Sequence, residues 1–115
     1  LFMGKKLWFF FPSDQIDLLH GGKVNPFQPN LDLYPNLVHA SPLICVQEVG
    51  EMVYTPSGWW HCVLNLEKGF ALTENFINEL NFDDVMKDLL SVGATKAIAK
   101  LKGIRQSFSV RKQSV

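Results

Sequence analysis

Cysteine is scarce in this sequence, and its two copies are not placed to work together. Cys45 and Cys62 lie seventeen positions apart, and no C-x-x-C motif occurs in the 115 residues. Zinc knuckles and disulfide frameworks are excluded, because both need cysteines at short, regular spacings. The sequence therefore predicts an intracellular, nuclear or cytoplasmic protein whose fold depends on packing.

Long hydrophobic runs are also absent. The longest extends from Leu7 to Pro12, whereas a bilayer-spanning helix needs about 20 apolar residues. Lys5 and Lys6 precede the run, but it is too short for the apolar part of a secretory signal. We therefore expect no membrane partner.

Acidic residues are missing from the C-terminal end. Residues 1–93 carry five lysines and eleven acids, which gives 5 − 11 = −6, whereas residues 94–115 carry six basic residues and no acid, which gives +6. Such a basic terminus is usually solvated. Contact with nucleic acid stays open but is less favoured, because Phe108 is the only aromatic residue there for base stacking.

Apolar residues make up 47% of the sequence, which is enough for a buried core. The chain opens on Leu1-Phe2 and soon enters an apolar strand, so we expect its start to cut through a domain. Five strands are predicted from short apolar or alternating runs closed by turn residues. They are Leu7–Phe11, Leu43–Val49, Glu51–Tyr54, Trp59–Leu66 and Phe70–Ile77.

Closely spaced strands with tight corners predict a sandwich or barrel. The long excursion of residues 13–41 interrupts them, with one helical turn expected at Asp14–Leu19. Two helices should follow the strands. The first runs from a cap at Asn81 or Asp83 to Leu90, and the second covers Lys96–Leu101.

Alternation along Trp59–Leu66 separates a mixed face from an apolar one. Trp60, Cys62, Leu64 and Leu66 are predicted to face the core, whereas Trp59, His61, Val63 and Asn65 share the other face. If Glu67-Lys68-Gly69 forms a hairpin loop, Asn65 pairs with Ala71, Val63 with Thr73, and His61 with Asn75. From the residues alone, that polar patch is either a satisfied internal network or a binding site.

Several sequence segments around His61 resemble those of a known family. Residues 50–61 read GEMVYTPSGWWH, residues 63–66 read VLNL, and residues 71–76 read ALTENF, while GKKLW stands at residues 4–8. These segments resemble the C-terminal half of JmjC domains. They are closest in wording to the small subgroup that includes the lysyl hydroxylase and arginine demethylase once called the phosphatidylserine receptor.

The resemblance implies a mainly β fold with C-terminal helices, namely part of a double-stranded β-helix of the jelly-roll or cupin-like kind. Residues 1–79 would form the C-terminal half of the domain, residues 80–103 a helical extension, and residues 104–115 a basic tail. The helices would cover the open edge of the barrel or form a homodimer.

The resemblance also implies a site. His61 would be the distal histidine of the two-histidine, one-carboxylate triad that binds Fe(II). Lys6 would pair with the far carboxylate of 2-oxoglutarate, and Thr73 would hydrogen-bond the same group. Asn65 would face the site.

The sequence departs from the family because it has no His-x-Asp motif, which supplies the other two iron ligands. Replacement by His39 with Asp32, or by His20 with Asp17, stays open. We therefore expect one part of an Fe(II)- and 2-oxoglutarate-dependent oxygenase, of the protein hydroxylase or demethylase type. Its partner would be a protein or another macromolecular substrate, and the chain would be inactive alone. The alternative is a non-catalytic cupin-like binding or scaffold module.

Overall fold

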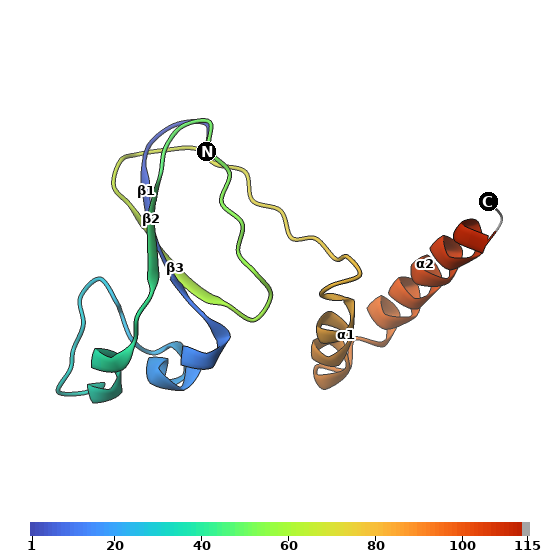
Figure 1. The fold of residues 1–115 in the computed structure, drawn as a ribbon, viewed down its shortest axis with the longest axis horizontal. Helices are drawn as coiled ribbons and strands as arrows, with labels where there is room; N and C mark the ends of the chain where they lie inside the picture. The colour runs from blue at the N-terminus through green and yellow to red at the C-terminus, as the bar shows by residue number, and fades with distance from the viewer. Residues whose placement is uncertain (114–115) are drawn as a thin grey trace. The chain divides into compact units, whose positions relative to one another are not determined.

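The computed structural model describes the backbone of residues 1–113 and the side chains of residues 1–107. The chain forms two compact units, Leu1–Glu74 and Asn75–Val115. The first contains a β-sheet and the second a pair of helices, drawn from blue to yellow and from yellow to red in Figure 1. An antiparallel sheet followed by helices is the predicted arrangement. Among the described residues, no helix combines the length and hydropathy needed to cross a bilayer.

Within residues 1–113 the sheet has three strands, in the order β2-β1-β3. They are β1 (Lys6–Phe11), β2 (Leu43–Gln47) and β3 (Trp60–Asn65), and β1 is antiparallel to both neighbours. The apolar run that begins at Leu7 thus forms the central strand, where both edges of the backbone are hydrogen-bonded. Three of the predicted strands are confirmed to within two residues at each end.

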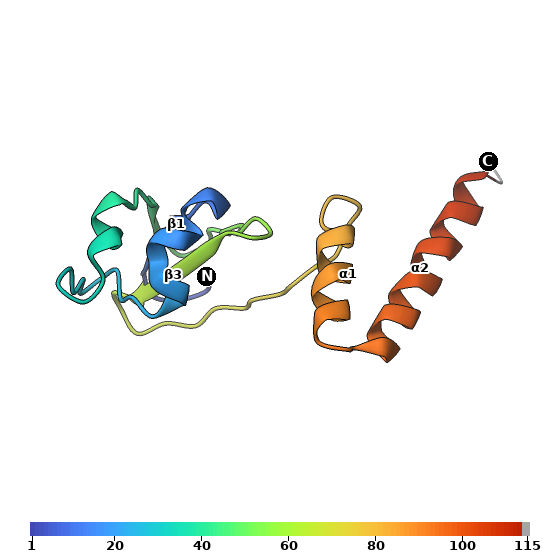
Figure 2. The same ribbon diagram turned by 90° about the horizontal axis from the view of Figure 1, so that it is seen from below.

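The long connection after β1 folds onto one face of the sheet. It contains two 3₁₀ helices, η1 (Ser13–Gly22) and η2 (Pro35–His39). Leu19 of η1 and Leu37 of η2 pack with Phe11 into the buried cluster, and Phe9, Trp60 and Cys62 of the sheet lie against it. Figure 2 shows η1 in front of β3. This confirms that Trp60 and Cys62 face the core.

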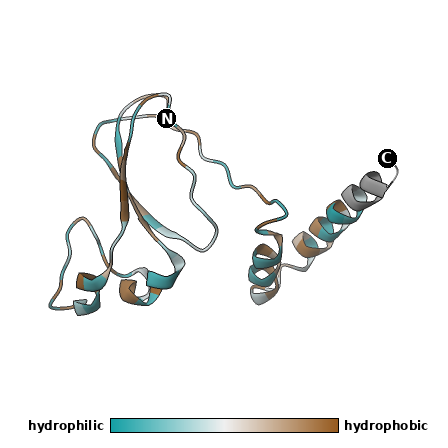
Figure 3. Ribbon diagram, viewed as in Figure 1, coloured by the Kyte–Doolittle hydropathy of each residue, from teal (hydrophilic) through white to brown (hydrophobic). Residues whose placement is uncertain are grey.

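Two further residues predicted for the core are not buried. Leu64 and Leu66 have 42% and 45% of their surface exposed. The cluster lies around Phe11 and Trp60, which are paired at one end of the sheet, whereas Leu64 pairs with Leu7 near the other end. Figure 3 shows brown, hydrophobic residues along the middle of the overlapping strands β1 and β2.

Two of the predicted strands do not form. Residues 51–54, before β3, are not a strand, and neither are residues 71–77, so the predicted hairpin after β3 is wrong. The chain does not turn back at Glu67-Lys68-Gly69 but continues beside the N-terminus. The Lys5 carbonyl accepts hydrogen bonds from the backbone N–H groups of Leu66 and Glu67, at 2.9 and 3.2 Å, and Phe70 then forms an isolated bridge with Met3.

Two glycines allow this continuation. Gly4 has a φ of +91°, and a methyl group on it would lie 2.7 Å from the Gly69 Cα. A methyl group on Gly69 would lie 2.3 Å from the Met3 carbonyl oxygen. The two backbones therefore approach more closely than any side chain would permit, as at other glycine-containing bulges.

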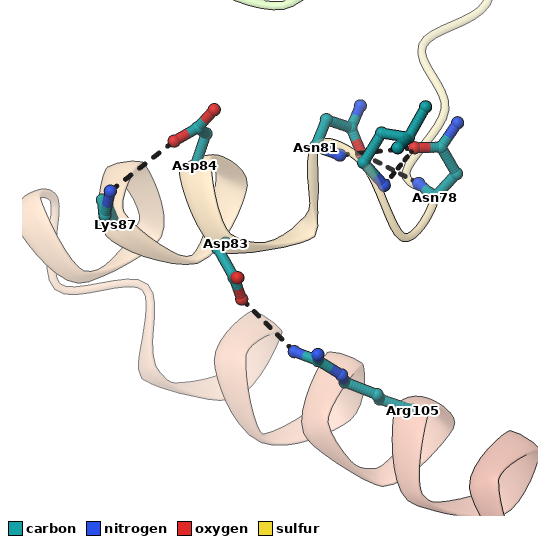
Figure 4. A network of polar contacts seen from close by, with 7 residues as sticks. Asn78, Asn81, Asp83, Asp84, Lys87 and Arg105 are labelled. Carbon is teal, nitrogen blue, oxygen red and sulfur yellow. Dashed lines mark hydrogen bonds and ion pairs between the residues drawn. The ribbon is translucent and has the colours of Figure 1, made fainter.

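The second unit consists of α1 (Phe82–Ser91) and α2 (Thr95–Gln113). Met86 of α1 and Ile98 of α2 are buried. Asn81 precedes α1, but its side chain forms no capping bond; its Oδ1 accepts instead from the Asn78 N–H at 2.8 Å (Figure 4).

The second helix is longer than predicted, because it passes through Gly103 and continues to Gln113. Contacts beyond the glycine favour this. The Arg105 guanidinium lies 3.3 Å from an Asp83 carboxylate oxygen (Figure 4). It also lies 4.5 Å from the centroid of the Phe82 ring. Residues 104–113 of the predicted tail are thus helical, whereas residues 114–115 lie outside the described residues.

Candidate functional site

The face of the sheet opposite the buried cluster carries the predicted polar residues. Strand pairing arranges it in three rows, which are Gln47–Lys6–Asn65, Cys45–Trp8–Val63 and Leu43–Phe10–His61. Paired residues of antiparallel strands project to the same side. Lys6, Asn65 and His61 therefore share one face, which we call the ligand face, and it consists of these nine residues.

Lys6 and His61 lie at opposite ends of the ligand face. The row of Lys6 and the row of His61 are four residues apart on both β1 and β3. At about 3.3 Å per residue, the rows are about 13 Å apart. A lysine side chain can cover part of that distance, which leaves room for a short, extended ligand between ammonium and imidazole.

His61 is exposed but bordered by aromatic rings. Its ring centroid lies 5.7 Å from that of Trp8 and 6.2 Å from that of Phe10, both at an interplanar angle of 34°. Trp8 and Phe10 are themselves stacked in parallel. The imidazole is thus held beside a rigid apolar surface with an edge open to solvent.

Lys6 differs sharply from its neighbour Lys5. On the other side of the strand, the Lys5 ammonium lies 3.1 Å from a Glu48 carboxylate oxygen, and this hydrogen bond raises the pKa of Lys5. Lys6 is half-buried, and within the described part of the chain its ammonium forms neither an ion pair nor a hydrogen bond. A half-buried cation without a counter-ion is suited to bind an anion.

The structure brings Asn65 to Lys6 but does not bring Thr73 to the ligand face through strand pairing. Asn65 is the direct partner of Lys6 and is exposed. Thr73 lies three positions beyond the bridge at Phe70, in a stretch without regular structure, and its side chain is exposed. The expected pairing of Thr73 with Val63 does not form among the described residues, where the strand partner of Val63 is Trp8 of β1.

Two residues of the ligand face were missed by the sequence reasoning. The Trp8 indole Nε1–H donates to the Gln47 Oε1 at 2.9 Å, and the Gln47 Nε2 donates to the Glu51 carbonyl oxygen at 3.0 Å. Period-two alternation from Lys6 would have found Trp8. The same alternation from Leu43 would have found Gln47, but only with the register of β2 known.

The alternative iron ligands are not assembled. Among the described residues, no three His, Cys, Asp or Glu side chains lie close enough together to hold a metal ion. His39 is exposed at the end of η2. His20 lies beside Tyr34, with ring centroids 5.2 Å apart, and its buried Nε2 has no hydrogen-bond partner.

A small cavity of about 100 Å³ lies nearby, but it is not the ligand face. Its walls include Phe11, Leu19, Trp60 and Cys62, and His61 borders it, while Lys6 and Asn65 do not. Burial on this side raises the pKa of the Cys62 thiol.

Comparison with known proteins shows which family the sequence is similar to. Residues 1–86 match the family model described as a cupin-like domain. The chain is 39% identical over 102 residues to the lysine-specific demethylase JMJ21 of Arabidopsis thaliana, covering 77% of this chain and 11% of that protein. It is 39% identical over 90 residues to the mouse 2-oxoglutarate and iron-dependent oxygenase JMJD4, covering 71% of this chain and 21% of that protein.

Mouse JmjC domain-containing protein 8 is 38% identical over 65 residues, covering 56% of this chain and 24% of that protein. The chain thus spans no more than a quarter of the length of these relatives. The predicted resemblance to JmjC domains and the predicted partial jelly-roll are confirmed. The chain belongs to the family of cupin-like domains, as a segment of the JmjC type.

Proposed function

We propose that this chain provides the cosubstrate-binding part of an Fe(II)- and 2-oxoglutarate-dependent oxygenase of the protein hydroxylase or demethylase type. The observation that carries the proposal is the unpaired ammonium of Lys6 on the same face as His61. Two of the relatives bear names that fit such an activity, one as an oxygenase and one as a demethylase.

The ligand face suits a dicarboxylate that carries a 2-oxo group at one end. Lys6 offers a cation for the far carboxylate, and the paired Asn65 offers an amide N–H beside it. Thr73 remains the predicted hydroxyl donor to the same carboxylate. It would reach that position if the stretch after Phe70 were drawn alongside the sheet by a further segment of the domain.

His61 is the proposed iron ligand, and it is one ligand of three. The described residues do not complete the set, and we propose that a His-x-Asp motif elsewhere in the full-length protein supplies the other two. When bound, iron and 2-oxoglutarate together supply the activation of molecular oxygen for C–H hydroxylation, with release of succinate and carbon dioxide. We propose that the chain alone is inactive for that reason.

A paired substitution tests the proposal. In the full-length protein, Lys6→Met should raise the KM for 2-oxoglutarate in a succinate-release assay, because the far carboxylate loses its cation. The matched control is Lys5→Met, which removes the adjacent ammonium on the opposite face and should leave that KM unchanged. His61→Ala should abolish succinate release.

Equal effects of Lys5→Met and Lys6→Met would contradict the assignment of the ligand face. Iron-independent activity, or undiminished activity of His61→Ala, would contradict the assignment of the metal ligand.

The second candidate is a non-catalytic cupin-like scaffold. It is favoured by the absence of a three-ligand cluster among the described residues and of a His-x-Asp motif in the sequence. Isothermal titration with Fe(II) under anaerobic conditions separates the two functions. The full-length oxygenase should bind about one iron per chain, and a scaffold should bind none.

The partners are proposed on the same basis. A demethylase or protein hydroxylase acts on a protein or another macromolecule, so we expect a macromolecular substrate in a nuclear or cytoplasmic compartment.

The helices α1 and α2 are the proposed dimer contact, because apolar side chains such as Leu90 and Ile104 remain exposed on them. Analytical ultracentrifugation of a chain with both changed to Glu should show a monomer. The basic segment of residues 104–115 is a weaker candidate for nucleic-acid contact.

A further inference from the structure

A buried amide lies at the edge of the ligand face. Among the described residues, Gln47 is the polar side chain that is buried, with 6% of its surface exposed. Burial of an amide costs free energy unless its donor and acceptor both find partners. Here its Oε1 accepts from the Trp8 indole and its Nε2 donates to the Glu51 carbonyl, so both ends are engaged.

These partners fix which way the amide points. An indole N–H can only donate, and a backbone carbonyl can only accept. The Gln47 Oε1 must therefore face Trp8, and its Nε2 must face Glu51. An amide held from both ends in this way has one orientation, and it determines in turn where the Trp8 N–H can lie.

Trp8 passes this constraint to His61. Its ring is stacked on Phe10, with centroids 5.4 Å apart and an interplanar angle of 2°, and the two rings together border the imidazole. Rotation of the indole would break its hydrogen bond to Gln47 and open the stack. The orientation of the aromatic surface beside His61 therefore depends on the hydrogen bond that Trp8 forms with Gln47. Gln47 belongs to β2, two strands away from His61.

We propose that Gln47 is a positioning residue for His61, acting through Trp8. A ligand imidazole must be held in one orientation, and groups outside the ligand shell that orient it typically change metal affinity when they are removed. The significance for catalysis rests on the proposed function. The positioning itself does not, because it is a property of this chain that can be measured without iron.

The test compares two glutamines that are each bonded at both ends. Gln47→Met removes the amide but keeps the length of the side chain. The matched control is Gln15→Met, because the Gln15 amide is likewise hydrogen-bonded at both ends. It accepts from the Ser41 N–H at 2.7 Å and donates to the Ser41 carbonyl at 3.2 Å. Neither of these bonds involves the ligand face.

The readout is heteronuclear NMR of the whole 115-residue chain. In Gln47→Met the Trp8 indole N–H signal should shift and lose its protection from hydrogen exchange, and the His61 ring signals should shift through altered ring currents. Gln15→Met should leave both sets of signals in place. Unmoved His61 signals in Gln47→Met would overturn the proposal, as would equal shifts in the two variants.

A measurement on the unaltered chain covers the case in which Gln47→Met does not fold. The Trp8 indole hydrogen should then exchange more slowly than in the urea-unfolded chain, and nuclear Overhauser contacts should connect the Trp8 and His61 rings. Exchange at the unfolded rate, or the absence of these contacts, would overturn the proposal.

The full-length protein supplies the functional arm. Gln47→Met should lower the apparent affinity for Fe(II) about tenfold, as outer-shell changes do. If the proposed function fails, the wild-type protein shows no succinate release and no iron binding, while the NMR result still decides the role of Gln47. If the wild type is active and Gln47→Met binds iron normally, the positioning role is refuted.

Discussion

Replacement of Gly69 by alanine should unfold the junction between the N-terminus and the segment after β3. The added methyl group would lie 2.3 Å from the Met3 carbonyl oxygen, which is backbone and cannot move aside without breaking the local pairing. That pairing consists of three backbone hydrogen bonds, from Phe2 and Met3 to the Phe70 carbonyl and from Phe70 to Met3, at 2.9, 3.2 and 3.0 Å. Each such bond stabilises the fold by about 1 kcal/mol net.

The expected loss in the free energy of unfolding is therefore about 2 to 3 kcal/mol. The matched control is Gly50→Ala. Gly50 has a φ of +87° but no atom within 4 Å of the added methyl group, so only the conformational cost of about 1 kcal/mol applies.

Urea unfolding followed by tryptophan fluorescence measures both variants. All three tryptophans belong to the Leu1–Glu74 unit, so the signal reports that unit alone. If Gly69→Ala costs no more than Gly50→Ala, the close approach of the two backbones is refuted, and with it the continuation of β3 beside the N-terminus.

Three further predictions follow from packing and charge. Leu19→Ala should lower the free energy of unfolding by about 3 kcal/mol in the same assay, because Leu19 is 2% exposed. A loss no larger than that caused by changing an exposed leucine to alanine would contradict its place in the core. In a Cys45→Ser background at pH 8, Cys62 should react with a thiol reagent more slowly in the folded than in the unfolded chain, because burial raises its pKa. Since the folded pKa is the higher one, the stabilisation linked to the neutral thiol is present below the unfolded pKa and is lost as the pH rises through the folded pKa; faster reaction in the folded chain would contradict this. Arg105→Ala should lower the stability of the helical unit by about 1 kcal/mol or less, through loss of its contact with Phe82, and an unchanged circular-dichroism melt at 222 nm would contradict that contact.

The sequence predicted strands correctly where apolar residues follow one another or alternate with polar ones. The run after Lys6 and the alternation around His61 predicted β1 and β3, and alternation placed both residues correctly on their strands. It could not show that β1 lies between β2 and β3, because strand order depends on contacts between residues far apart in the chain. That order is what sets Lys6 beside both Asn65 and Gln47.

Both errors arise from tertiary contacts that the local sequence does not reveal. Glu67-Lys68-Gly69 has the composition of a hairpin loop, but Gly69 is needed for close approach to Gly4, which lies more than sixty positions away. Gly103 is a residue type that often ends a helix, but Arg105 contacts Asp83 and Phe82 of α1, and these contacts favour a helix that continues. In both places a tertiary contact outweighs a local preference.

The central claim is tested most directly by titrating the isotopically labelled 115-residue chain with 2-oxoglutarate and following its NMR signals. Binding at the ligand face predicts shifts at Lys6, Asn65 and His61, with none at Lys5 and none when Lys6 is changed to Met. Shifts confined to Lys5 and its neighbour Glu48, or identical shifts in Lys6→Met, would contradict it.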